Sequence, residues 1–221
     1  MKKQILVVGL GQFGKSVAST LFNMGHEVLA IDTDERSVQA IASQITHAAQ
    51  ADATDEAVLR ELGAGNFDLA VVTIAAEIEN SVLCTILLRN LGVSHIIARA
   101  NNKLHGSILE RIGAEKVVYP EQEMGDRIAH EIEMGEVTDY LALGEKYSVA
   151  KVLAPPYCVE KTLLELGFGP EGKWKLAVLL IHRQNEAIIS PTGDETINTG
   201  DTLIIAGDLT ELDQLLAEAK K

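Results

Sequence analysis

The feature that most constrains this chain is a glycine-rich run that follows directly on an apolar segment. Residues 9–16 read GLGQFGKS, residues 5–8 before them are apolar, and apolar residues recur afterwards at positions 13, 17 and 21. This pattern predicts a strand, a tight turn and a helix. The free amide groups and the positive dipole end at the start of such a helix form a binding site for anions.

The same eight residues fit two phosphate-binding motifs. Gly9, Gly11 and Gly14 have the spacing of the dinucleotide-binding fingerprint. In that motif they provide, in order, a tight turn, a close approach of a diphosphate to the backbone, and close packing of helix against strand. Gly14 followed by Lys15 and Ser16 also satisfies the P-loop pattern, in which Lys grips phosphates and Ser binds magnesium.

Asp32 favours the dinucleotide interpretation. It ends a second apolar run, residues 27–31, and lies about twenty residues past the glycines, as the fingerprint requires. A carboxylate there accepts hydrogen bonds from ribose hydroxyls and repels a 2′-phosphate. A P-loop protein would place its magnesium-binding Asp on another strand, usually further along. We therefore expect a Rossmann unit, and keep a P-loop ATPase and a glycine turn without a ligand as alternatives.

Strands and helices continue to alternate up to about residue 134. Strands are expected at 5–8, 27–31, 47–50, 69–74, 95–98 and 116–118, and helices at 13–23, 34–43, 55–62, 77–91, 103–112 and 121–134. Short, nearly all-apolar strands between helices predict a parallel sheet covered on both faces. The expected fold class is α/β, a Rossmann-like doubly wound parallel sheet, with a second, smaller α+β domain.

The second domain begins where this alternation stops, near residue 135. Strands are expected at 137–143, 147–153, 175–181, 187–189 and 202–206, together with a short helix at 159–166 and a terminal helix at 209–220. Turn residues separate the strands. We place the boundary between residues 135 and 136, which gives domains of 1–135 and 136–221.

Composition narrows the possible functions. The 221 residues, 47% of them hydrophobic, suffice for an ordinary domain and a small one. A net charge of -13 makes nucleic acid a poor partner. Cys84 and Cys158 lack metal-site spacing and are expected to be free thiols in a reducing cytosol. No signal peptide is evident and no apolar run is long enough to span a bilayer, so a membrane role is expected only through a partner.

Taken together, the two halves resemble the regulatory subunits of Ktr/Trk-type potassium uptake systems, which are RCK proteins of the TrkA family. The residues that carry the resemblance are VVGLGQFG at 7–14, MGHEVLAID at 24–32, ADAT at 51–54, ARA at 98–100, IGAE at 112–115, YPE at 119–121 and the hairpin at 197–206. The resemblance implies an RCK N-terminal nucleotide-binding Rossmann domain over 1–135 and an RCK C-terminal, TrkA-C-like domain over 136–221.

The resemblance also implies a nucleotide site at the carboxyl ends of the strands. The implied residues are Gly9, Leu10, Gly11, Gln12, Phe13, Gly14, Asp32, Thr33, Asp34, Asp52, Ala53, Thr54, Ile74, Ala75, Ala76, Arg99, Asn101, His105 and Glu121. The glycine turn would hold phosphates, residues 32–34 the ribose, and residues 52–53 the adenine, while Arg99, Asn101 and His105 would lie on the other side of the phosphates. Glu121 would help to hold Mg²⁺ or Ca²⁺ near the terminal phosphate, at a subunit interface.

Several of these residues also have a structural interpretation, which the sequence leaves open. Asp52 is suited to cap a turn, and Glu121 is favoured at a helix N-terminus by the dipole alone. Arg99 fits an ordinary surface charge, and His105 fits a surface or packing residue.

Gln12 departs from the family pattern and widens the choice of nucleotide. Many Ktr-type members have Arg within the glycine loop, where it grips the terminal phosphate and favours ATP over ADP. The family resemblance implies ATP or ADP. Because Gln12 carries no charge to grip a terminal phosphate, AMP and NAD are kept as alternatives. Some relatives bind cyclic di-AMP in the second domain through a basic residue after a short helix. This chain has GFGPEG at 167–172 there, and cyclic di-AMP is kept as a candidate ligand.

The expected function is that of a cytosolic, nucleotide-sensing subunit of a gating ring. The resemblance implies dimers joined by a crossover helix, on which Met124, Ile128 and Ile132 form an apolar stripe, and an octameric ring of these dimers. An intramolecular core is the other interpretation of that stripe. The ring would lie at the inner face of the cell membrane and control a separate potassium-translocating subunit.

A catalytic function is the main alternative to this sensor. An NAD-dependent oxidoreductase would need an acid or base at the cleft. The second domain offers His182 inside an apolar strand and no Ser/His/Asp or Cys/His set. We therefore expect no enzymatic activity, with the oxidoreductase as the alternative and the P-loop ATPase behind it.

Overall fold

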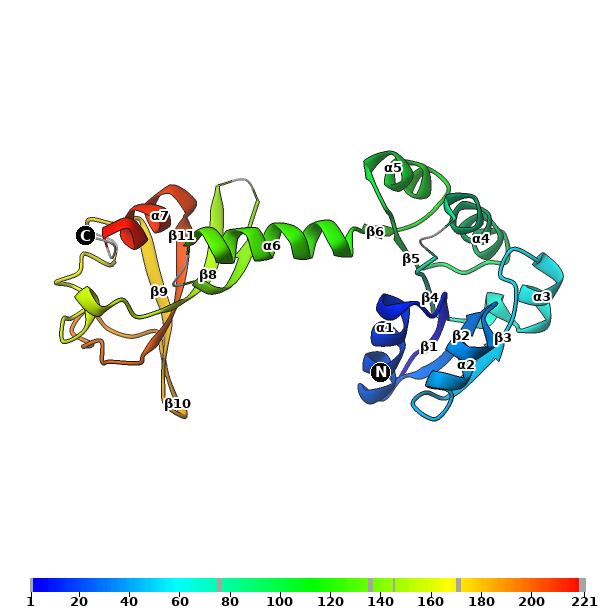
Figure 1. Cartoon of the computed structure of the whole chain (residues 1–221), viewed down its shortest axis with the longest axis horizontal. Coiled ribbons are helices and arrows are strands. Elements are labelled where there is room, and N and C mark those ends of the chain that lie inside the picture. The colour runs from blue at the N-terminus through cyan, green and yellow to red at the C-terminus, as the bar shows by residue number, and fades with distance from the viewer. Residues whose placement is uncertain (1, 75–76, 135–136, 145, 170–171, 219–221) are drawn as a thin grey trace. The chain divides into compact units, whose positions relative to one another are not determined.

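The chain folds into two compact units. The computed structural model describes residues 2–74, 77–134, 137–144, 146–169 and 172–218. The units are Met1–Gln122 and Glu123–Lys221 (Figure 1). The boundary between them along the chain falls inside helix α6, Pro120–Met134. A domain boundary between residues 135 and 136 stays a prediction.

The first unit is built on a six-stranded parallel sheet with the order β3-β2-β1-β4-β5-β6. Its strands are β1 Gln4–Val8, β2 Glu27–Asp32, β3 His47–Gln50, β4 Leu69–Val72, β5 Ile96–Arg99 and β6 Lys116–Val118. Its helices are α1 Gln12–Asn23, α2 Glu35–Ile41, α3 Glu56–Glu61, the 3-10 turn η1 Ala64–Asn66, α4 Ile78–Asn90 and α5 Lys103–Arg111. The strand order reverses between β1 and β4, and such switch points open a crevice at the carboxyl ends of the strands.

Alternate residues of the central strand face two separate cores, as expected for a sheet covered on both sides. Ile5 and Val7 pack on one side with residues of α1 and α2, such as Ala18 and Ile41. Leu6 and Val8 pack on the other side with residues of α3, α4 and α5. The α/β fold class expected from the sequence is confirmed.

Short polar side chains start three helices of this unit. Asp34 accepts hydrogen bonds from the backbone amides of residues 36 and 37 at the start of α2. Asp55 accepts from the amide of residue 57 at the start of α3, and Asn102 accepts from the amide of residue 105 at the start of α5. Each bond satisfies an amide that the helix leaves without an internal partner.

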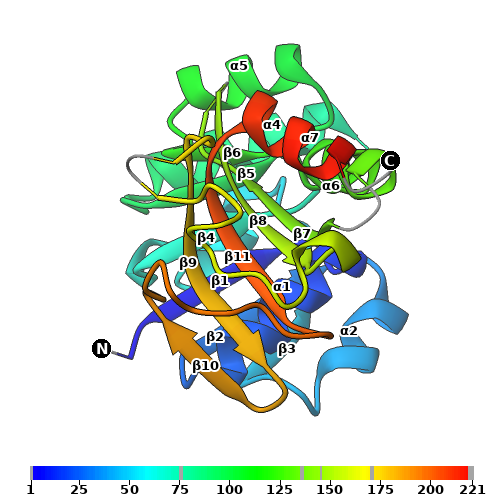
Figure 2. The ribbon, with the colours of Figure 1, turned by 90° about the vertical axis from the view of Figure 1, so that its left-hand side faces the viewer.

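The second unit contains a five-stranded antiparallel sheet with the order β10-β9-β11-β8-β7 (Figure 2). Its strands are β7 Val137–Ala142, β8 Tyr147–Leu153, β9 Leu176–Arg183, β10 Glu186–Ile189 and β11 Thr202–Asp208, followed by α7 Leu209–Glu218. One face of the sheet packs into a core: Ala150 and Val152 of β8 lie with Leu203 and Ile205 of β11 and with Leu212 of α7.

The helix expected at residues 159–166 is absent from the structure, and that prediction was wrong. The 3-10 turn η2, Pro156–Cys158, is followed by turns, and Glu160 has a φ of 65°, which no right-handed helix uses. The amide of Glu160 donates to Ile197 O (2.8 Å), and the amide of Leu163 donates to Glu195 O (3.1 Å). Because these amides bond to a distant segment, they cannot make the local bonds of a helix.

An ion pair between the half-buried Arg183 and the buried Asp201 links the end of β9 to the residue that precedes β11. Arg183 Nη2 donates to Asp201 Oδ2 (2.8 Å) and Nε donates to Oδ1 (3.0 Å), while Glu195 Oε1 lies 3.1 Å from Nη1. The amide of Asn198 also donates to Asp201 (2.8 Å). Burial acts to raise the pKa of Asp201, but the bonds from Arg183 and Asn198 outweigh it and leave the pKa below its usual value.

None of the helices within the described residues combines the length and the apolar character needed to cross a bilayer.

Candidate functional site

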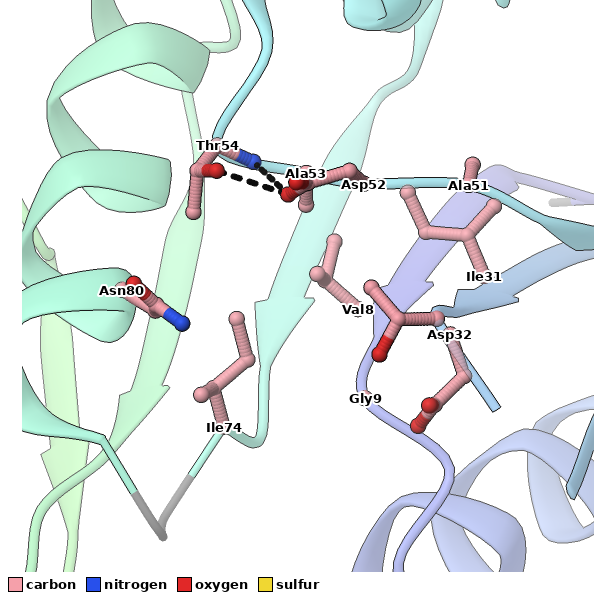
Figure 3. Close-up of a pocket in the computed structure, with 11 residues that line it drawn as sticks. Val8, Gly9, Ile31, Asp32, Ala51, Asp52, Ala53, Thr54, Ile74 and Asn80 are labelled. Atoms are coloured by element: carbon pink, nitrogen blue, oxygen red, sulfur yellow. Dashed lines mark hydrogen bonds between the residues drawn. The ribbon is translucent and has the colours of Figure 1, made fainter.

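A small pocket lies at the carboxyl ends of β1, β2, β3 and β4, at the switch point between β1 and β4 (Figure 3). The residues that line it are Val8, Gly9, Ile31, Asp32, Thr33, Ala51, Asp52, Ala53, Thr54, Ile74 and Asn80. Its volume is about 80 Å³. Whole-ligand pockets usually measure about 300–1,000 Å³. A nucleotide would therefore occupy this pocket with only one part and extend out along the glycine turn.

The three glycines of the turn do not have equal structural roles. Gly9 has a φ of 97°, which favours glycine, and its amide donates to Ile31 O (2.8 Å). A Cβ at Gly14 would lie 2.0 Å from Gly9 O, so helix α1 can approach the strand only without a side chain there. A Cβ at Gly11 would meet no atom within 4 Å. The fold thus needs Gly9 and Gly14 but not Gly11, and the open space above Gly11 suits an approaching phosphate.

Thr73 clamps this turn and was not identified from the sequence. Its hydroxyl donates to Gly9 O (2.7 Å) and lies 3.1 Å from Val8 O, and its own amide donates to Val8 O (2.8 Å). The side chain is 4% exposed. Its position directly after β4, one residue before the predicted Ile74, is the signal that would have pointed to it.

Asp32 joins the second strand to the glycine turn. Its Oδ2 accepts from the amide of Leu10 (2.5 Å) and its Oδ1 accepts from the amide of Asp34 (2.8 Å). A carboxylate has about four acceptor positions, so about two remain for the hydroxyls of a ribose. Figure 3 shows Asp32 beside Gly9 on one side of the pocket, opposite Ile74.

The neighbours of Asp32 differ in what they offer the pocket. Thr33 lines it, whereas the carboxylate of Asp34 caps α2. A hydrogen bond from the Ser37 hydroxyl is the largest cause of the lowered pKa of Asp34. Asp34 therefore contributes to the site chiefly through the backbone amide that positions Asp32.

At the end of β3, Asp52 and Thr54 form a local turn that presents backbone to the pocket. Asp52 Oδ1 accepts from the hydroxyl of Thr54 (2.7 Å) and from its amide (2.9 Å), and these bonds lower the pKa of Asp52. Ala53 between them is 5% exposed. The turn-capping interpretation of Asp52 is correct, and Asp52, Ala53 and Thr54 all line the pocket.

Arg99 and Glu121 form a second group, which does not line this pocket. Arg99 ends β5, Glu121 is the second residue of α6, and Arg99 Nη2 lies 2.5 Å from Glu121 Oε1. The Arg99 side chain is 16% exposed, and its Nε is buried without a hydrogen-bond partner among the described residues. A guanidinium held in this way retains donor capacity for an anionic group.

His105, at the start of α5, is buried, and its Nε2 has no hydrogen-bond partner among the described residues. The residue is 1% exposed, and its Nδ1 accepts from the backbone amide of Asn101 (3.3 Å). Burial lowers the pKa of His105, because the charged ring would be poorly solvated. Asn101 is exposed beside it.

The predicted residues thus fall into four groups. The pocket itself is lined by Gly9, Asp32, Thr33, Asp52, Ala53, Thr54 and Ile74. The turn and the helix starts beside it contain Leu10, Gly11, Gln12, Phe13, Gly14 and Asp34, and a third group along β5, α5 and α6 contains Arg99, Asn101, His105 and Glu121. The fourth group, Ala75 and Ala76, lies outside the described residues. Thr73 and Asn80 are the residues that the sequence interpretation missed.

Within the described parts of the chain, no cluster of three or more His, Cys, Asp or Glu side chains is placed to hold a metal ion. A divalent ion at Glu121 would depend on the oxygens of a bound phosphate for its other ligands.

Comparison with known proteins identifies the family. The TrkA-N domain matches residues 5–120 and the TrkA-C domain matches residues 148–220. The chain belongs to the TrkA family, in which a TrkA-N domain is followed by a TrkA-C domain. It is 41% identical to Ktr system potassium uptake protein C of Bacillus subtilis, over 96% of this chain and 95% of that protein. It is 38% identical to Ktr system potassium uptake protein A of the same organism, over 93% and 91%. The resemblance to the Ktr-type proteins is confirmed.

Solved structures support the same fold at lower sequence identity. The GsuK RCK domain superposes with a TM-score of 0.67 and 17% identity, over all of this chain and 48% of that one. The GsuK channel bound to NAD superposes with a TM-score of 0.65 and 17% identity, over all of this chain and 40% of that one. At these identities the likeness establishes the fold alone.

Proposed function

We propose that this chain is a nucleotide-sensing regulatory subunit of a potassium uptake system, and that it controls a separate membrane subunit through which the ion passes. The observation that carries the proposal is the pocket at the switch point, where the Asp32 carboxylate and the open backbone at Gly11 stand together. The likeness to two Ktr potassium uptake proteins along nearly the whole chain supports the transport system.

The proposed ligand is an adenine nucleotide. Its phosphates would lie on the turn above Gly11, its ribose on the remaining acceptor positions of Asp32, and its base between Ala53 and Ile74. ATP or ADP is the first choice, and AMP or NAD are alternatives because Gln12 brings no charge to the loop. Structures of GsuK bound to NAD and to ADP are consistent with a fold that accepts either.

Arg99 and Glu121 are the residues proposed to respond to the phosphates. A terminal phosphate near Arg99 would compete with Glu121 for the guanidinium, and a Mg²⁺ or Ca²⁺ ion on that phosphate would attract the released carboxylate. Because Glu121 lies in the first turn of α6, either change acts on the helix that contains the boundary between the two units. Such a change shifts an equilibrium only by its differential affinity for two conformations.

The proposed assembly is a dimer that forms an octameric ring at the inner face of the cell membrane. Three large apolar side chains of α6 are exposed in the single chain: Met124 (48%), Ile128 (47%) and Ile132 (77%). Their i, i+4, i+8 spacing places them along one face of the helix, which favours contact with another subunit. Cyclic di-AMP remains a candidate ligand of the second unit.

The proposal is tested with the purified full chain. Calorimetric titration with ATP, ADP, AMP and NAD should give saturable binding to at least one of them, with a matching rise in melting temperature. Light scattering should show oligomers, and potassium flux through the membrane subunit in vesicles should depend on the nucleotide. A chain that binds none of the four nucleotides at millimolar concentration would contradict the proposal.

The same purified protein also tests the two catalytic alternatives. An oxidoreductase would turn over NADH with carbonyl substrates, and a P-loop ATPase would hydrolyse ATP in a manner abolished by Lys15→Ala. We expect neither activity.

A further inference from the structure

Asn80 lies at the end of the pocket that faces away from the glycine turn. It is the third residue of α4, is half-buried, and lines the pocket. Figure 3 shows Asn80 and Ile74 on one side of the pocket and Gly9 and Asp32 on the other. If phosphates lie at Gly9 and the ribose at Asp32, Asn80 is at the place where the base ends.

The rest of α4 holds this side chain in place. Ser81, the next residue, and Cys84, one turn further, are completely buried, so the helix is anchored against the core on the side next to Asn80. Asn80 Nδ2 also donates a hydrogen bond to the carboxylate of Glu77. Because a carboxylate only accepts, this bond determines which end of the amide is the nitrogen.

That bond leaves Asn80 with one N–H and the carbonyl oxygen Oδ1 unused within the described part of the chain. Two other polar side chains of the pocket already make hydrogen bonds within the chain. The Thr54 hydroxyl donates to Asp52, and both Asp32 oxygens accept from backbone amides. The amide of Asn80 is therefore placed to offer a donor and an acceptor side by side to the edge of a base.

We infer that Asn80 selects a 6-aminopurine, such as adenine, over a 6-oxopurine; this inference rests on the nucleotide function proposed above. An Asn amide matches the edge of adenine, since its oxygen accepts from the 6-amino group and its N–H donates to a ring nitrogen. In hypoxanthine or guanine the 6-position carries an oxygen, which would face the amide oxygen with no hydrogen between them. Asn80 would thus be a specificity-determining residue at the base end of the site.

The test compares ADP with IDP, which differ in the base at position 6 and lack the 2-amino group that would confuse a comparison with GDP. Both are titrated by calorimetry into the full chain, as wild type, as Asn80→Leu and as Asn80→Ala. Asn90→Leu is the matched control, because Asn90 is the last residue of the same helix and is exposed, away from the pocket. Thermal unfolding of each variant shows that it is folded.

The wild type should bind ADP about tenfold or more tightly than IDP, as expected for one bidentate amide–base pair. Both Asn80 variants should lose most of that ratio, chiefly by weaker binding of ADP, while Asn90→Leu keeps it. Equal affinity of the wild type for the two nucleotides, or a ratio that survives in the folded Asn80 variants, would overturn the inference and leave the proposed function standing. Binding of neither ADP nor IDP to the wild type would overturn the inference, and if ATP, AMP and NAD also fail to bind, the proposed function falls with it.

Discussion

Replacing Gly11 by alanine separates ligand binding from folding at the glycine turn. Gly11 precedes α1 with φ −65° and ψ −177°, a conformation open to any residue, and an added Cβ would meet no atom within 4 Å. At Gly14, in contrast, the added Cβ would lie 2.0 Å from Gly9 O and 2.6 Å from Thr73 Oγ1. The same chemical change at the two glycines should therefore have different consequences.

The expected magnitudes follow from these contacts. For Gly11→Ala, the stiffer unfolded chain contributes roughly 0.4–1 kcal/mol of stability, and a poorer residue at the helix start costs a similar amount, so the net change is near zero. For Gly14→Ala, the better helix former contributes roughly 0.5–1 kcal/mol, but overpacking against a backbone carbonyl lies at or above the upper end of the usual range of about 1–3 kcal/mol. A net loss of roughly 2 kcal/mol would lower the melting temperature of the first unit by roughly 8 °C.

The assay measures thermal unfolding and ADP binding in parallel. Gly11→Ala should melt like the wild type and bind ADP about tenfold or more weakly, a penalty of about 1.4 kcal/mol or more, because its methyl group occupies the space of the phosphates. Gly125→Ala is the control for a glycine-to-alanine change: it lies in α6, its Cβ also meets nothing within 4 Å, and it is outside the pocket.

Two results would refute this reasoning. Wild-type affinity for ADP in Gly11→Ala would show that the phosphates do not lie on this turn. A fall in melting temperature for Gly11→Ala as large as that for Gly14→Ala would show that the open space is filled in solution.

Three further predictions follow from buried groups. Burial lowers the pKa of His105 below its usual 6.5, so the unfolded chain takes up a proton before the folded chain does as the pH falls. The free energy of unfolding measured in urea should therefore keep its full value above about pH 6.5 and decline below it. This decline should be smaller in His105→Gln. Burial raises the pKa of Cys84 to about 12 and that of Cys158 above its usual value, so a chromogenic disulfide reagent should label both thiols only after unfolding. Arg183→Met leaves the carboxylate of Asp201 buried without its cation and should lower the free energy of unfolding of the second unit by about 3 kcal/mol in urea, whereas adding Asp201→Asn should restore part of the loss.

The first unit was predictable because each of its elements is encoded by its own residues. Strands such as Gln4–Val8, whose last four residues are apolar, alternate with helices, and the side chains of Asp34 and Asp55 cap two of these helices locally. The turn at residues 159–166 was not predictable in this way. Its apolar spacing is that of a helix, but its backbone bonds to residues 195–197, a partner that no local pattern reveals.

The candidate site shows the same division. Asp32 and the glycine turn carry their signal in their spacing, and the structure joins them through the Leu10 amide. Thr73 carries only its position directly after β4, and Asn80 carries no signal of its own, because a hydroxyl after a strand and an amide in a first helical turn are common in any protein. Only the packing of β4 and α4 against the switch point places them beside the turn and the pocket.

The two backbone bonds of Asp32 have a consequence for genetics. A screen for strains that no longer respond to the nucleotide would recover changes at codon 32 even if no sugar ever touched the side chain, since losing the carboxylate also releases the amides of Leu10 and Asp34. In such alleles, a disrupted turn and a lost ligand contact would produce the same phenotype. A substitution at Gly11, whose side chain position is open, isolates the second of these.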